Sequence, residues 1–308
     1  MNGRRDWKIL LGGAVIGFMI NGCGGGSTPS SEQGDEVPTQ DTMAMIDQTN
    51  KTMVIASLMT GQEETDSLIN DSFLRKSVKS LKRIGGGSLI DNMLITKKVE
   101  KRLDKTYSDT YSCSVSGDIY VRGDDSGNYE ITYNHCNDGY GEWNGYERVE
   151  NSGDRIYAYY DHLSYVTDSQ EFMIERLDET ITLNDDGYIQ KLDYTISGYF
   201  HSDESDIAFS NYRVTEELED DMLRESIHGY VNTSCLSGWL KVDEEVVYDT
   251  WDGSYYGEVF YTGKNSELHI VYEESGEVDV YLNGTLTDHY NSEEDFESYY
   301  YASNSCQS

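Results

Sequence analysis

The stretches Tyr129–Asn134 (YEITYN) and Glu267–Tyr272 (ELHIVY) decide the predicted fold of this chain. In both, large apolar residues alternate with polar residues. Because the side chains of a β-strand point alternately to its two faces, a period of two predicts strands with one covered face and one solvated face. The same alternation recurs from Tyr107 onward, whereas a helical period of about 3.6 residues precedes it.

Short turn sequences interrupt this alternation about every ten residues. They are rich in Gly, Asn and Asp, which supply the positive φ angles that tight hairpins need. Many strands joined by short turns form an antiparallel meander, which must curl or close to hide its edges. We therefore expect a mainly β fold, an antiparallel meander curled into a half-barrel or sandwich. The predicted turns are Asp125–Asn128, Asn137–Gly139, Asn151–Asp154, Asn184–Gly187, Trp251–Ser254, Thr262–Asn265 and Glu274–Glu277.

A faint internal similarity indicates that the β region contains two similar halves, 107–215 and 226–308. Ser-Gly pairs precede or open predicted strands, and their glycines indicate β-bulges or close approaches of another backbone. The acidic, turn-poor run Glu216–Glu225 is predicted to be a short helix or loop between the halves. The three glycines are Gly117, Gly198 and Gly238.

Charge is divided unevenly along the chain, whose net charge is −34. Residues 1–106 hold 14 Lys and Arg against 13 Asp and Glu, a net +1, whereas residues 107–308 hold 9 against 44, a net −35. All 26 tyrosines lie at or after Tyr107, which marks a domain boundary there. A domain this acidic repels phosphate backbones, so nucleic acid is excluded as its partner.

Residues 42–106 form a predicted basic helical region. Apolar residues at helical spacing predict helices over Thr42–Met59 and Asp66–Ile84, separated by Gly61, and a weaker helix follows Gly87. From Arg75 to Lys105 the sequence has ten basic and three acidic residues. Three interpretations stay open: solvated helix faces, a patch that docks on the acidic β domain, or a surface for anionic lipid or cell-wall polymer.

The first residues have the layout of a secretory signal peptide. Basic Arg4, Arg5 and Lys8 precede the apolar run Ile9–Ile20. As a helix this run would rise about 18 Å, too short for a hydrocarbon core of roughly 30 Å. The paired arginines also resemble a twin-arginine export motif, which leaves the export route open.

The four residues that end at Cys23 (INGC) resemble the lipobox of bacterial lipoproteins. This resemblance implies cleavage after residue 22, a lipid on Cys23 and, since Gly24 rather than Asp follows the cysteine, sorting to the outer membrane if the host is Gram-negative. The lipid would then hold the protein at the cell envelope, with residues 23–41 as lipidated cysteine and flexible linker. Simple cleavage, or retention of the leader, is the alternative.

The remaining four cysteines are expected to form two disulfides in an oxidising compartment. We favour Cys113 with Cys136, which flank one predicted hairpin, and Cys235 with Cys306, which would tie the C-terminus to the sheet. A zinc site is disfavoured because no close cluster of Cys and His exists in the sequence.

The sequence contains no catalytic motif that we recognise, and we expect no catalytic residue, metal or cofactor. Asp124, Ser126 and Asn128 have the spacing that opens a calcium loop, but the glycine and the closing glutamate of that loop are missing. Six single histidines are scattered along predicted strands and are expected on strand surfaces.

Aromatic residues offer the best binding candidates. Tyrosines placed on both faces of a strand, also at Tyr299–Tyr301, cannot all lie in one core, and exposed ones suit sugars or a protein partner. Half-buried sheet packing is the simpler alternative. The favoured function is a non-enzymatic binding or structural module at the cell envelope, with a glycan or envelope protein as ligand. The alternatives are a carrier of an apolar ligand and a carboxylate-dependent polysaccharide hydrolase; the oligomeric state stays open. The candidate binding residues are Tyr157, Tyr159, Tyr160, Tyr255, Tyr256 and Trp251.

Overall fold

The computed structural model describes residues 37–68, 107–124, 126–168, 170–184, 189–202, 206–219, 222–249 and 254–302. The predicted leader, the predicted lipidation site Cys23, the predicted linker up to residue 36 and the basic stretch Arg75–Lys105 lie outside these residues, as do Trp251 and Cys306. The α-helices are α1 (Lys51–Leu68) and α4 (Glu293–Ala302), and a 3₁₀ turn η1 (Gln40–Thr42) precedes them. Within the described residues, neither helix has the length and apolarity that crossing a bilayer requires.

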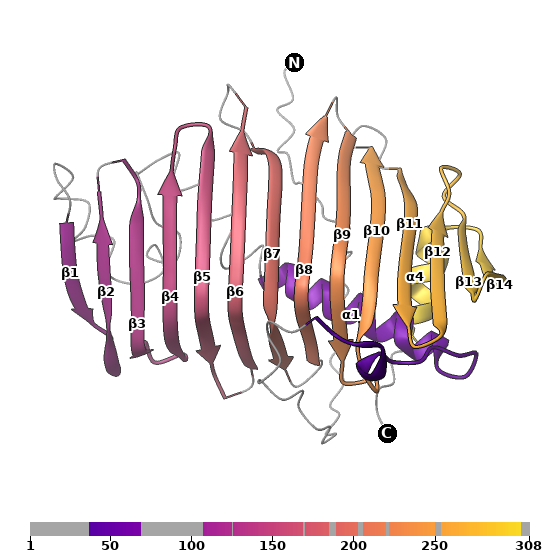
Figure 1. The fold of residues 1–308 in the computed structure, drawn as a ribbon, viewed down its shortest axis with the longest axis horizontal. Helices are drawn as coiled ribbons and strands as arrows, with labels where there is room; N and C mark the ends of the chain where they lie inside the picture. Colours follow the sequence, from indigo (N-terminus) through magenta and orange to yellow (C-terminus); the bar gives the residue numbers. More distant parts are fainter. Residues whose placement is uncertain are drawn as a thin grey trace, which may run out of the picture.

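Fourteen strands form one antiparallel sheet in which every strand pairs with its neighbours in sequence (Figure 1). The prediction of an antiparallel meander is therefore confirmed, and the sheet stays open, with β1 and β14 as its edges. The strands are β1 (Tyr107–Ser112), β2 (Ser116–Gly123), β3 (Tyr129–Asn137), β4 (Glu142–Asn151), β5 (Arg155–Val166), β6 (Gln170–Leu183), β7 (Ile189–Ser202), β8 (Asp206–Glu219), β9 (Met222–Thr233), β10 (Leu240–Asp249), β11 (Tyr255–Gly263), β12 (Ser266–Tyr272), β13 (Val278–Leu282) and β14 (Thr285–Tyr290).

The predicted division of the sheet at Glu216–Glu225 is wrong. The described residues of this run, Glu216–Glu219 and Met222–Glu225, form the paired ends of β8 and β9, where Glu216 lies opposite Glu225 and Glu219 opposite Met222. Their cross-strand pairing outweighs the weak strand propensity of acidic residues. The sheet therefore continues without interruption between the supposed halves.

Irregular pairing recurs across the sheet at positions where glycines with positive φ lie inside strands. Gly145, Gly198 and Gly229 each lie beside a shift in strand register. Gly117 lies at another shift and faces the backbone of His135, so the bulge predicted from its Ser-Gly pair is confirmed. Bulges bend a strand and increase its twist, so these positions shape the sheet.

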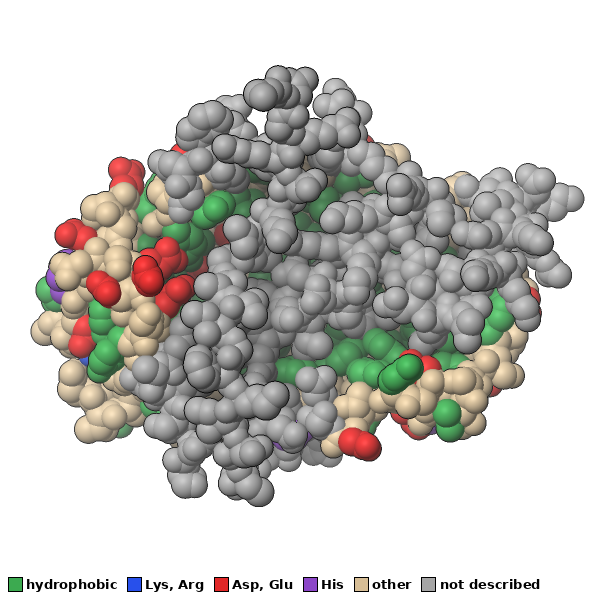
Figure 2. All heavy atoms as spheres, turned by 180° about the vertical axis from the view of Figure 1, so that it is seen from behind, with side chains coloured by type: hydrophobic (Ala, Val, Ile, Leu, Met, Phe, Trp, Pro, Cys, Tyr) green, Lys and Arg blue, Asp and Glu red, His purple; other side chains and the backbone are tan. Residues whose placement is uncertain are grey.

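One face of the sheet forms the core. On β2, Ile119 and Val121 are buried while Tyr120 between them is exposed, and β10 repeats the pattern with Leu240 and Val242. This alternation is the period of two seen in the sequence. Helices α1 and α4 lie on that side, behind the β7–β13 part of the sheet in Figure 1. Viewed from behind, hydrophobic side chains are visible there among the described residues (Figure 2).

The predicted helix over Thr42–Met59 begins later than expected. Met43 forms a parallel bridge with Trp239, and the Ala44 amide donates to the Trp239 carbonyl at 2.8 Å. The backbone at Met43 is therefore paired with the residue that precedes β10 and is not helical. The Asp47 carboxylate accepts the Asn50 amide at 3.1 Å and turns the chain into α1. Helix α1 then passes through Gly61, which was expected to end a helix.

Gly238, just before β10, allows the backbone of Thr42–Ala44 to lie close against it. A Cβ on Gly238 would lie 3.0 Å from the Ala44 amide nitrogen, so only glycine lets the two backbones approach. The close approach predicted from its Ser-Gly pair is confirmed. Further along, the buried Lys51 ammonium contacts Asp288 and the Thr287 hydroxyl on β14, which ties the start of α1 to the far edge of the sheet.

Residues Tyr299–Tyr301, expected in a strand, belong to α4. The helix starts with three acidic residues, which favour the positive end of a helix dipole, and the Ser292 hydroxyl accepts the Asp295 amide at 3.1 Å. Phe296 and Tyr300, four residues apart, are both fully buried against the core. A helical period was therefore present in the aromatic residues.

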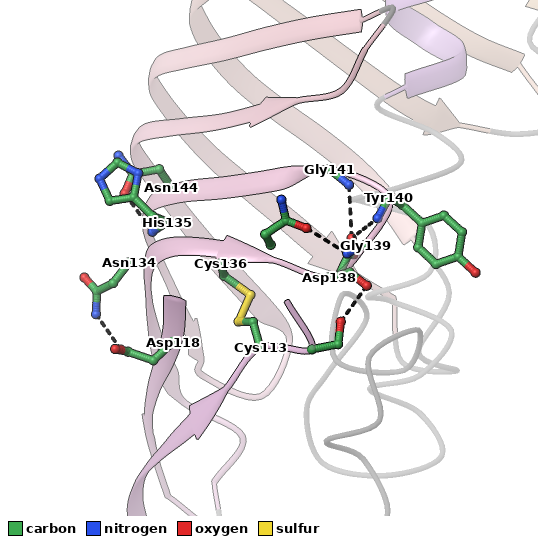
Figure 3. Close-up of a disulfide and its surroundings, with 12 residues drawn as sticks. Cys113, Asp118, Asn134, His135, Cys136, Asp138, Gly139, Tyr140, Gly141 and Asn144 are labelled. Carbon is green, nitrogen blue, oxygen red and sulfur yellow. Dashed lines mark hydrogen bonds between the residues drawn. A yellow bond between two sulfur atoms is a disulfide. The ribbon is translucent and has the colours of Figure 1, made fainter. Parts of the chain in front are cut away.

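The predicted disulfide between Cys113 and Cys136 is confirmed (Figure 3). It joins the β1–β2 turn to β3, with the two Cα atoms 5.5 Å apart. Next to it the Asp138 carboxylate accepts the amides of Tyr140 and Gly141 at 2.8 and 3.1 Å, which closes the predicted turn after β3. The proposed pairing of Cys235 with Cys306 stays a prediction.

Removing this disulfide should destabilise the sheet. The bond closes a loop with a sequence separation of 23 residues. Chain-entropy arguments assign such a loop a stabilisation of about 3 kcal/mol. We expect the C113S/C136S double variant to unfold at lower denaturant concentration by that amount. Adding a reductant should shift the unfolding midpoint of the parent protein more than that of the variant; equal shifts would contradict the assignment.

Candidate functional site

Three glutamates are buried on the core face of the sheet, where charge is costly. Glu147 on β4, Glu179 on β6 and Glu244 on β10 are 2%, 1% and 7% exposed. Carboxylates are rarely buried unless they are paired, because desolvation disfavours the charged form. Within the described ranges, no salt bridge pairs a cation with Glu147 or Glu179, so these two carboxyl groups form the candidate site.

Glu147 lies in a cluster of tyrosines. The Tyr129 hydroxyl donates to Oε1 at 3.0 Å and the Tyr133 hydroxyl donates to Oε2 at 3.4 Å, both from β3. Burial raises the pKa of Glu147 to about 7, although the two tyrosine hydrogen bonds oppose the shift. Tyr160, directly opposite on β5, is also buried, and burial with the nearby Glu147 and Glu179 raises its pKa.

Glu179 is more isolated. Its cross-strand neighbours are Ala158 on β5 and Tyr194 on β7. Neither of its carboxyl oxygens has a hydrogen-bond partner among the described residues. Burial, followed by the nearby Glu147 and Glu216, raises the pKa of Glu179 to about 8. The group is therefore largely neutral at pH 7.

The pKa values of these two carboxyl groups are not pushed in opposite directions, as they are in a hydrolytic pair. Glu147 on β4 and Glu179 on β6 have one strand, β5, between them. Glu179 is also offset by two residues in register, which places the two Cα atoms about 12 Å apart. Glycoside hydrolysis uses one protonated and one ionised carboxyl group, whose pKa values are pushed apart. Here burial raises both pKa values in the same direction, so the geometry does not favour the hydrolase alternative.

The predicted binding tyrosines are divided between the faces of the sheet. Tyr157 and Tyr159 lie on the outer face of β5, where the Tyr157 hydroxyl donates to Asp178 at 2.7 Å. Tyr256 lies on the outer face of β11, six strands away. Tyr160 and Tyr255 lie on the core face, Tyr160 buried and Tyr255 packed on Tyr272 with ring centroids 4.8 Å apart. Of the candidates that fall within the described residues, only Tyr157 and Tyr159 lie together.

On the outer face of the sheet, many charged side chains are paired with side chains of opposite or complementary charge. Each histidine ring contacts a carboxylate, as in the His269 pair with Glu258 at 3.1 Å. The six pairs are His135–Glu142, His162–Asp161, His201–Asp206, His228–Asp243, His269–Glu258 and His289–Asp279. The expectation that the histidines lie on strand surfaces agrees with these positions.

Aromatic rings on the outer face also contact each other. His269 stacks between Phe260, at a centroid distance of 4.1 Å, and Tyr281, at 5.5 Å. Because stacked rings cover each other's faces, this ladder offers a sugar mainly ring edges rather than a flat platform. Tyr159 contacts Tyr146 edge-on at 6.4 Å and keeps a more open surface.

The loop that resembles the start of a calcium site is an ordinary hairpin turn. The Asp124 carboxylate accepts the Ser126 amide at 2.9 Å and the Asn128 side-chain amide at 2.9 Å. These hydrogen bonds hold the turn and lower the pKa of Asp124. Among the described residues, no group of three His, Cys, Asp or Glu side chains is placed to hold a metal ion.

Glu147 and Glu179 were not recognised from the sequence, although a signal exists. Glu179 occupies the apolar phase of its strand, with Leu177 two residues before it and Ile181 two residues after it. Glu147 precedes Val149 in the same way. A search for acidic residues at apolar positions of the alternation would have found both. Comparison with known protein families and with curated proteins finds no match for this chain.

Proposed function

We propose that this chain is an exported, lipid-anchored module of the cell envelope that acts by binding a ligand and does not catalyse a reaction. The basic start, the apolar run and Cys23 support export and anchoring. The continuous sheet with two chemically different faces supports binding. The observation that carries the proposal is Glu179, a buried carboxyl group without a hydrogen-bond partner among the described residues, within a largely apolar face.

Two kinds of ligand fit the two faces. A glycan or an envelope protein, the ligands favoured by the sequence, would use the exposed Tyr157 and the half-buried Tyr159 on the outer face. A carrier of an apolar ligand would use the core face. The carboxyl groups of Glu147 and Glu179 favour this second candidate, because ligand sites are mostly apolar with a few placed polar groups.

Anchoring is tested by the C23S variant. Without the thiol no thioether-linked lipid can form, so we expect loss of an alkyne-labelled fatty acid from the protein and its release into the soluble envelope fraction. Mass spectrometry of the parent protein should find an N-terminus at residue 23 carrying the lipid. Fatty-acid labelling of C23S equal to that of the parent would contradict the proposal.

Binding is tested on the full secreted chain freed from its lipid by C23S. We expect organic-solvent extraction or native mass spectrometry to find a ligand on the core face, or glycan arrays and envelope pull-downs to find one that depends on Tyr157. A Y157F/Y159A variant would separate these outcomes, because it alters only the outer face. Robust hydrolysis of a polysaccharide by the parent protein would overturn the non-enzymatic assignment.

A further inference from the structure

Glu179 is one member of a row of side chains that crosses the core face. Strand register aligns Tyr129, Val149, Ala158, Glu179 and Tyr194 on β3 to β7. All five are buried, with exposures between 1% and 6%. Ala158 is the smallest of them and is the direct neighbour of Glu179, so no bulky side chain opposes the carboxyl group from β5. Glu179 is thus the only acidic group in a row of apolar and aromatic residues.

Glu147 and Glu179 differ in the hydrogen bonds that they accept. The hydroxyls of Tyr129 and Tyr133 both donate to Glu147, which satisfies each of its oxygens. No described residue does the same for Glu179. Burying a polar group without a partner is unfavourable, and native structures rarely retain one unless it has a role. The arrangement therefore points to a hydrogen-bond donor that is not part of the described residues.

The charge around Glu179 specifies the donor. Glu147 and Glu216, the two charged groups identified as acting on Glu179, are both acidic. A cationic donor would be attracted by all three carboxyl groups and would favour their ionised form. Leu177 and Ile181, on either side of Glu179 along β6, are buried aliphatic residues that suit an apolar body beside the cationic head. A metal ion fits less well, because the described residues place no set of three ligands together.

We propose that Glu179, with Glu147 two strands away on the same face, forms the polar end of a site for an amphipathic organic cation, a molecule with a hydrocarbon body and an ammonium head. The inference rests on the proposed binding function and names the ligand class for the core face. The ammonium donates to the Glu179 carboxylate, and the hydrocarbon body lies along the aliphatic residues of β5 to β7. Binding ionises Glu179, so a proton leaves the protein as the cation binds.

The test uses the full C23S chain and octylammonium as the probe. Octanol and octanoate are matched probes that keep the hydrocarbon body and remove or reverse the charge. In titration calorimetry at pH 7 we expect octylammonium to bind at least about tenfold more tightly than either. The E179Q variant should lose about tenfold or more in octylammonium affinity, whereas E245Q, a change of an exposed glutamate on β10, should leave it unaltered. Titration in two buffers of different ionisation enthalpy should show proton release in the parent protein and none in E179Q.

Three outcomes would overturn the inference. Equal binding of the three probes would indicate a purely apolar site, and equal octylammonium affinity in parent and E179Q would place the cation elsewhere. If no probe binds, the inference is wrong, and destabilisation of E179Q at pH 7 would then show that a cation of the chain itself already occupies the position. None of these outcomes affects the anchoring experiment or the outer-face ligand screen, so failure here is distinguishable from failure of the proposed function.

Discussion

Replacing Glu179 with glutamine should make the stability of the protein less dependent on pH. The folded-state pKa of Glu179 is raised from 4.5 to about 8. Below pH 4.5 the carboxyl group is protonated in both the folded and the unfolded state, so its raised pKa does not lower the free energy of unfolding. Above pH 4.5 the unfolded state ionises first, so the free energy of unfolding falls as pH rises towards 8. A rise in pKa from 4.5 to about 8 corresponds to nearly 5 kcal/mol in full, at about 1.36 kcal/mol for each pKa unit, and about 4 kcal/mol of this cost is present at pH 8.

The measurement is denaturant unfolding of ligand-free C23S and C23S/E179Q at pH 4.5, 6 and 8. At pH 4.5 the glutamine variant should be equal to or slightly less stable than its parent, because it too buries an unpaired polar group. By pH 8 its relative stability should have improved by about 3 to 4 kcal/mol. E245Q, which changes an exposed glutamate, is the control and should follow the parent at every pH. Parallel stability profiles of parent and E179Q would show that Glu179 ionises freely in the folded protein.

The strands were predictable because their signals are local. Alternation in Tyr129–Asn134 and Glu267–Tyr272, with turn residues between strands, gave the antiparallel meander, since hairpins join residues close in sequence. The errors occurred where distant contacts outweigh local preference. The chain at Met43 is extended because it pairs with Trp239, almost two hundred residues away, and no local pattern contains that partner.

The candidate site was missed for a different physical reason. In a chain with 57 acidic residues a glutamate is uninformative by its type. Glu179 differs from the exposed Glu245 only in the face on which it lies, and the face follows from the phase of the alternation, which bulges change along a strand. The aromatic candidates show the same dependence on the phase of the alternation, because Tyr159 and Tyr160 are adjacent in sequence yet lie on opposite faces of β5.

Replacing Gly229 with alanine should destabilise the centre of the sheet by about 3 kcal/mol or more. Gly229 lies on β9 with φ of 154°, a conformation that L-residues rarely adopt. A Cβ there would lie 2.5 Å from Cα of Tyr212 and 2.6 Å from the Asn211 carbonyl oxygen on β8. Both contacts are with backbone, which cannot move aside without breaking the β8–β9 pairing. Denaturant unfolding of G229A in the C23S chain measures the loss.

The matched control is G276A in the β12–β13 turn. Gly276 also has a positive φ, of 86°, but a Cβ there would meet nothing within 4 Å. Its substitution reports the cost of positive φ alone, about 1 kcal/mol. The difference between the variants is the cost of the close backbone approach at the bulge. If G229A were no more destabilising than G276A, β8 and β9 would not be held together there, and the bulge could not shape the sheet. Hydrogen exchange of the β8 and β9 amides would locate the effect, since G229A should expose them selectively while G276A leaves them protected.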